Sequence, residues 1–345
     1  MGDNMQKCSE RWDGSVLFFK MTEAVHCLSL ILLFALLLLT TDCVAAKSFS
    51  KKKNRIARQA NYQPPNYQPL SKKVKKKKVK TLQKGTSSSA ARRAALAALP
   101  MKKLTKAQQK RVKHIVGNIG MFRKLPTLQF QIEPEAYQFF VKHPDVACSI
   151  WRVMKISQLE MYQTGPWRYD IDMKDGTVGV IDILQQSNTS QLIICEGEFK
   201  SPFITKPMKA EALLHLQAKQ IKDRQGKDIT VHQASLFVSF PSQTVEAAAK
   251  FISPISNIMI DQNFHEMSLF AQMMSFAMKR QPGWVEQTAN KMEGVLKIRK
   301  PQLIKLTAKV YLDYRKEQLT KSGKKHISIE DIMQPLRQIS AETQK

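Results

Sequence analysis

TVGVIDILQQSNTSQLIICEGEFK, residues 177–200, is the stretch of the chain that decides its fold class. Apolar residues recur at alternate positions on both sides of the polar turn 187–190. A period of two around a short polar turn is typical of a β-hairpin. The same pattern is found at residues 157–163, 167–173, 211–221 and 229–240. Together these segments predict an antiparallel meander of about six strands.

Segments with helical periodicity bracket the strands. They cover residues 106–119, 133–142 and 144–155 before the strands, and 244–252, 257–279, 284–292, 301–319 and 327–339 after them. Strands between helical blocks are typical of the α+β class, with helices covering at least one face of the sheet. We therefore predict a single α+β domain over residues 105–345.

Both faces of the predicted sheet are partly apolar. In the strand 191–200, Ile193 and Cys195 point to one face, and Leu192 and Ile194 point to the other. A sheet with one solvated face needs less apolar surface than this. Two arrangements satisfy the pattern: a curved sheet that grips a helix and encloses an apolar cavity, or helices packed on both faces with no cavity.

The N-terminal residues 1–46 have the features of an export leader. Residues 27–39 are thirteen consecutive uncharged and mainly apolar residues. This length fits the apolar region of a signal peptide better than a membrane span, and Val44-Ala45-Ala46 is a suitable cleavage site. The alternative is a retained anchor, in which the lysines and arginines that follow place the domain in the cytoplasm. Translation starts at Met1 or Met21.

A strongly basic segment follows the leader. Between Lys47 and Lys124 there are twenty-four lysines and arginines and no acidic residue. The net charge of the whole chain is +27, so the rest of the chain contributes only +3. We predict that residues 47–104 are disordered and of low complexity, because such a segment repels itself and buries little apolar surface. The densest run, which we expect to bind anions, consists of Lys72, Lys73, Lys75, Lys76, Lys77, Lys78 and Lys80.

The basic segment predicts an anionic partner. An anionic membrane surface or an acidic envelope polymer fits an exported protein, and nucleic acid fits a cytoplasmic one. The remaining alternative is a solvated spacer with no partner. The chain has no zinc-finger spacing, no RNA-binding aromatic pattern and no helix-turn-helix pattern that would read bases.

Four side chains form the candidate catalytic group. Glu196 and Glu198 share one strand face, and Asp182 and His215 are expected on the neighbouring strands. Carboxylates beside a histidine can perform acid–base chemistry in a hydrolase or bind a metal. Alternating glutamates also mark the solvated half of a strand, and no sequence motif of a known catalytic or cofactor site is present. The sequence therefore favours binding over catalysis, with no metal and no cofactor.

The segment 257–279 supplies the candidate ligand-binding residues. It is rich in methionine and phenylalanine, including Met267, Phe270 and Met274. Such helices fill irregular cores or line adaptable binding sites for apolar ligands. Cys148 and Cys195 remain after leader removal, and we expect two separate thiols, with a disulfide as the alternative.

Several short motifs resemble one protein family. They are His143-Pro144-Asp145-Val146, Ile150-Trp151-Arg152, Asp175-Gly176-Thr177-Val178, Glu196-Gly197 and Lys200-Ser201-Pro202. The resemblance is to leader-bearing proteins of planctomycete-type bacteria, and it covers residues 133–309. That family has no established activity, so it implies no catalytic residue. It implies an export leader and a bacterial origin. Together with the leader and the basic segment, we predict an exported protein of the cell envelope or periplasm; the alternative is a single inner-membrane span with a cytoplasmic C-terminus.

Overall fold

The computed structural model describes residues 79–199, 208–240, 243–324 and 326–333. The predicted leader 1–46 and the lysines between Lys72 and Lys78 lie outside these residues. The part of the chain that is described contains no helix long and apolar enough to cross a membrane. It forms an antiparallel sheet with flanking helices, which confirms the α+β class.

The sheet has nine strands in the order β1-β3-β9-β8-β7-β6-β5-β4, and β2 also pairs with β9. The strands are β1 Lys80–Gln83, β2 Ile119–Lys124, β3 Thr127–Gln131, β4 Glu160–Gly165, β5 Arg168–Asp172, β6 Thr177–Gln186, β7 Ser190–Phe199, β8 Met208–Lys222 and β9 Asp228–Ser239. The predicted six-stranded meander is β4 to β9, and each consecutive pair is antiparallel.

The prediction of about six strands omitted β1, β2 and β3. Strand β1 is exposed at all four positions, so it carries no alternation to detect. Strands β2 and β3 are short and are joined through Leu125 and Pro126. They pair with the long strand β9, which lies about 100 residues or more further along the chain, and a local sequence pattern cannot show such a contact.

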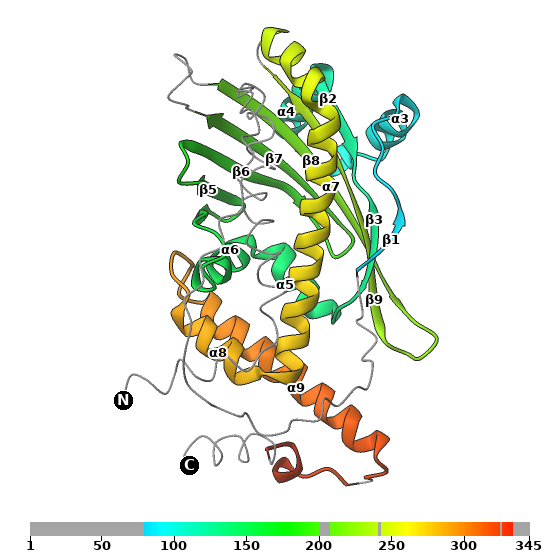
Figure 1. Cartoon of the computed structure of the whole chain (residues 1–345), viewed down its shortest axis with the longest axis vertical. Helices are drawn as coiled ribbons and strands as arrows, with labels where there is room; N and C mark the ends of the chain where they lie inside the picture. The colour runs from blue at the N-terminus through cyan, green and yellow to red at the C-terminus, as the bar shows by residue number, and fades with distance from the viewer. Residues whose placement is uncertain (1–78, 200–207, 241–242, 325, 334–345) are drawn as a thin grey trace, which may run out of the picture.

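One face of the sheet, the inner face, is covered by α5 Pro134–Lys142, α6 Pro144–Val153 and α7 Gln243–Arg280 (Figure 1). Helix α7 runs across the curved sheet, and α8 Pro282–Lys291 and α9 Arg299–Lys321 pack against its C-terminal half. The two predicted helices 244–252 and 257–279 are one continuous helix. The sequence suggests a break because Pro254 disfavours a helix interior.

The opposite, outer face is covered by α3 Ser89–Ala97, the 3-10 turn η1 Met101–Lys103 and α4 Lys106–Gly117. Their buried residues form an outer core with apolar side chains of β2, β7, β8 and β9. It consists of Ala95, Leu99, Leu104, Val112, Ile115, Phe122, Leu192, Ile194, Leu213 and Phe237.

The prediction that residues 47–104 are disordered is therefore wrong from Val79 onward. Lys80, one of the predicted anion-binding lysines, lies in β1. An isolated nine-residue helix such as α3 is marginal in water. Here the buried Ala95 on the sheet, and the cap that Ser88 places on the first turn, stabilise it. The folded domain begins before residue 105.

Candidate functional site

A cavity of about 270 Å³ lies between the inner face of the sheet and helices α5, α6 and α7. Strands β3 to β9 and the three helices all contribute side chains, nearly all of them apolar. Among the described residues that line it, none carries a formal charge. The structure thus combines the two predicted arrangements, with helices on both faces and a cavity on one of them.

Small residues on two central strands leave room for the cavity. Gly197 of β7 and Ala210 and Ala212 of β8 line it, and register places Gly197 beside Ala210. Ile193 and Cys195 continue the same face of β7, as the alternation predicts. An alternating strand with small side chains on its inner face leaves space that helices above the sheet do not fill.

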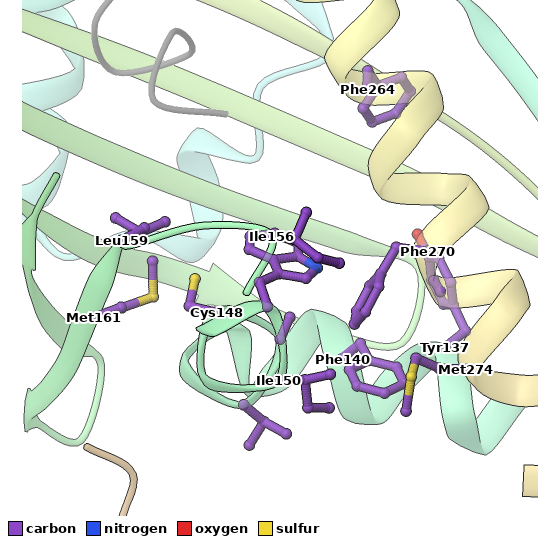
Figure 2. Close-up of a cluster of buried hydrophobic side chains, with 14 of the residues drawn as sticks. Tyr137, Phe140, Cys148, Ile150, Ile156, Leu159, Met161, Phe264, Phe270 and Met274 are labelled. Atoms are coloured by element: carbon purple, nitrogen blue, oxygen red, sulfur yellow. The ribbon is translucent and has the colours of Figure 1, made fainter. Parts of the chain in front are cut away.

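The helical wall of the cavity comes chiefly from α7. Phe264, Met267 and Phe270 line it, which places two of the three predicted ligand-binding residues at the site. Figure 2 shows Phe270 beside Phe140 of α5, and their ring centroids are 5.6 Å apart. Met267 is 40% exposed and therefore lies where the cavity meets solvent. The third predicted residue, Met274, is not among the residues that line the cavity and is buried in the core.

Three polar side chains meet in the cavity wall. Tyr137 Oη lies 3.1 Å from His232 Nδ1, and His232 Nε2 lies 2.8 Å from Ser268 Oγ. The imidazole is stacked on Phe264, with ring centroids 4.5 Å apart. This tyrosine–histidine–serine cluster joins α5, β9 and α7, and its side chains are buried.

Burial keeps this cluster neutral. Desolvation lowers the pKa of His232 to about 3 and raises the pKa of Tyr137 above its usual value. Ser268 Oγ lies 2.7 Å from the carbonyl oxygen of Phe264 and donates to it, because a carbonyl can only accept. His232 Nε2 therefore carries the ring proton and donates to Ser268, and Nδ1 accepts from Tyr137. A histidine in this tautomer cannot remove the Ser268 proton, so the cluster is not arranged as a nucleophile and its base.

Two cysteines of the domain line the same cavity. Cys148 and Cys195 are free, as predicted for two separate thiols. Burial raises the pKa of each thiol to about 12. They are therefore protonated near neutral pH and act as small apolar groups rather than nucleophiles.

The four predicted catalytic side chains lie on the outer face, away from the cavity. Arg111 of α4 binds Asp182 and Glu196, with 2.7 Å from Nη2 to each carboxylate. Glu198 lies 3.8 Å from Lys209 Nζ. His215 is buried, and its Nε2 lies 3.0 Å from Ser190 Oγ.

These four groups share a sheet face, as predicted, but they do not converge. Glu196 pairs across the ladder with Glu211, whereas His215 pairs with Leu192, four positions away along β7. Within the described residues no cluster of histidine, cysteine or carboxylate side chains has metal-binding geometry. The ion pairs with Arg111 instead attach α4 to the sheet, so these carboxylates form the solvated half of the strand pattern.

The sequence did not identify the tyrosine–histidine–serine cluster. The available signal was the phase of His232, which shares the inner face of β9 with Ala234 and Leu236. A polar residue in an apolar stripe requires a buried partner. The partners lie 95 and 36 residues away in the chain, in Tyr137 and Ser268, so only the fold reveals them.

No protein-family model matches the chain, and no curated protein does. Among solved structures, the chain is similar to a conserved protein from Geobacillus kaustophilus. The sequence identity is 11%, the TM-score is 0.32, and the match covers 44% of this chain and 93% of that protein.

Proposed function

We propose that the domain is a binding protein that holds one small apolar molecule between the sheet and α7. The apolar cavity is the observation that supports this function. Its lining matches the chemistry of small-molecule sites, which are concave, mostly apolar and equipped with a few fixed polar groups.

A neutral fluorescent probe tests the proposal. We expect the full chain to bind N-phenyl-1-naphthylamine saturably, because the probe is apolar and uncharged. Ala212→Phe places a ring in the cavity and should weaken probe binding at least about tenfold. Val178→Phe is the matched control, because Val178 is 46% exposed and lies outside the cavity lining. Equal binding by wild type and Ala212→Phe would remove the basis of the proposal.

We further propose that the basic segment holds the domain to an anionic surface of the cell envelope. Each lysine close to an anionic membrane contributes about 1 kcal/mol, and salt weakens the attraction. Co-sedimentation with vesicles of phosphatidylglycerol, compared with phosphatidylcholine, measures this binding. Replacing the six lysines between Lys72 and Lys78 by glutamine should strongly weaken the preference, and the basic residues that remain should retain part of it. Tighter binding to duplex DNA than to the anionic vesicles would instead support the nucleic-acid alternative.

Export itself is open to a direct measurement. Mass spectrometry of the protein from fractionated cells would give its N-terminal residue and compartment. A chain that begins at Lys47 outside the cytoplasmic membrane agrees with the proposal. An intact leader in the inner membrane would contradict it and favour the anchored form.

A further inference from the structure

The hydrogen bonds inside the tyrosine–histidine–serine cluster determine what it can offer a ligand. All three polar protons are in use: Tyr137 donates to His232, His232 donates to Ser268, and Ser268 donates to the carbonyl of Phe264. Oxygen lone pairs remain on Tyr137 Oη and Ser268 Oγ, since a hydroxyl oxygen can accept two hydrogen bonds. Towards a molecule in the cavity, the cluster therefore presents acceptors.

The direction of the three hydrogen bonds in the cluster cannot easily reverse. His232 is held by Phe264 on one side and by Phe130, whose ring centroid lies 4.9 Å away. A flipped tautomer would leave the 2.7 Å contact between Ser268 Oγ and the Phe264 carbonyl without a proton, because Ser268 would then donate to the imidazole. Two acceptor oxygens this close without a proton repel each other. The backbone of α7 thus fixes the direction of all three hydrogen bonds.

The surroundings also exclude a charged head group. No lysine or arginine is among the described lining residues, so a bound carboxylate would lose its hydration without gaining a counter-ion. Gln191 contributes an amide side chain to the described part of the wall, and its Nε2 already donates to the Val141 carbonyl at 3.3 Å. One remaining N–H does not offset the desolvation of an anion.

We infer that the cavity selects an amphiphile with an apolar body and a neutral hydrogen-bond-donating head, such as a long-chain alcohol, whose hydroxyl donates to Tyr137 Oη or Ser268 Oγ. This inference rests on the proposed function and adds the chemical class of the ligand. It assigns the polar end of the ligand to the junction of α5, β9 and α7.

Three ligands of one chain length test the selection in the full chain by displacement of N-phenyl-1-naphthylamine at about pH 8, where carboxylic acids are ionised. 1-Decanol can donate a hydrogen bond, decyl methyl ether can only accept, and decanoate is charged. We expect 1-decanol to displace the probe at about tenfold lower concentration than the ether, as the gain of one buried hydrogen bond implies. Decanoate should be weaker than both.

Two variants locate the selection in the cluster. At least one of Tyr137→Phe and Ser268→Ala should reduce the preference for the alcohol over the ether to about twofold or less, and that variant identifies the accepting oxygen. Their matched controls, Tyr169→Phe and Ser275→Ala, remove buried hydroxyls outside the cavity lining and should keep the full preference. The ligand series on the wild-type chain decides the question if a cluster variant does not fold.

The experiments distinguish failure of the inferred ligand selectivity from failure of the proposed cavity binding. If the ether or decanoate displaces the probe as well as the alcohol does, the inferred selectivity is wrong and cavity binding stands. If the probe does not bind and none of the three ligands protects the protein against thermal unfolding, both are wrong.

Discussion

Arg123 of β2 and Asp261 of α7 form an ion pair with two hydrogen bonds on the inner face of the sheet. Arg123 Nε lies 3.0 Å from Asp261 Oδ1, and Nη2 bonds the other carboxylate oxygen. Only 12% of the arginine side chain and 21% of the aspartate side chain are exposed. The pair fixes the position of α7, and with it the wall of the cavity, against the strand pair β2–β9.

Breaking this pair should destabilise the protein. Arg123→Met or Asp261→Asn each leaves a largely buried group without its partner, and we expect a loss of about 2–3 kcal/mol in the free energy of unfolding. Urea denaturation measures the loss. The double variant should cost clearly less than the sum of the two single changes, because the groups share one interaction. Additive costs would show that the two side chains do not interact.

Gly85, which follows β1, is packed against the same pair. A Cβ atom at this position would lie 2.5 Å from Asp261 Oδ2 and 2.6 Å from Arg123 Nη2. Gly85→Ala should therefore displace the ion pair and cost about 1–2 kcal/mol. Gly117→Ala is the control, because a Cβ there meets no neighbour and the position ends helix α4. Equal stability of the two variants would contradict the close packing.

Buried neutral histidines should make the fold sensitive to acid. The pKa of His232 is lowered to about 3, so below about pH 6.5 the unfolded chain binds a proton that the folded chain does not. Its contribution to stability is complete above pH 6.5 and falls as the pH drops towards 3. The free energy of unfolding should decrease by about 1.4 kcal/mol per pH unit from this residue alone.

Comparing pH profiles of two variants isolates that contribution. His232→Phe keeps the aromatic packing and should show a shallower loss of stability between about pH 5.5 and 4 than the wild type. His326→Phe, at an exposed side chain, should keep the wild-type slope. An unchanged slope in His232→Phe would mean that this histidine does not stay neutral in the fold.

The outer-face carboxylates should affect stability slightly and binding not at all. Arg111→Met removes the bond to Asp182 and Glu196 and should cost about 0.5–1 kcal/mol, because the pairs are partly solvated. Arg168→Met is the control, since Arg168 reaches only Asp182 and is 52% exposed. Probe binding by both variants, and by Glu196→Gln, should equal that of the wild type. Loss of probe binding in Glu196→Gln would instead support a functional role for the predicted outer-face site.

The true start of the domain can be found by truncation. A chain that begins at Val79 should unfold at nearly the same urea concentration as the full chain. A chain that begins at Thr105 loses Ala95, Leu99 and Leu104 from the outer core, and we expect a loss of at least about 3 kcal/mol. If the chain that begins at Thr105 unfolds at the same urea concentration as the full chain, the predicted domain boundary at residue 105 is correct.

The parts of the fold that follow from the sequence are those with local signals. The strands from β4 to β9 were predictable because each carries its own alternation and short turns join most of them. Proline at the first turns of α5, α6 and α8 marks those helix starts. The helix that supplies Phe270 and Met267 to the cavity could be identified from its methionine and phenylalanine content, but only as one of two alternatives, because such helices also fill irregular cores.

The remaining features depend on tertiary contacts. The Ala-rich α3 is marginal alone, and only the sheet beneath it decides that it folds. His215 carried the same sequence signal as His232, yet the fold gives it Ser190 as its neighbour, outside the cavity. Which histidine belongs to the site is set by strand register and by a helix far along the chain.

Strand β1 also determines how force would enter the domain. Val79, which is buried, directly follows Lys78 in the chain, and β1 pairs with β3 alone. A load carried by the basic segment would therefore pass first through the short register from Lys80–Gln129 to Gln83–Thr127. Through β3 it would reach β9, a long strand that is third from this edge of the sheet and lines the cavity. Tension on the N-terminal segment would thus reach a wall of the cavity.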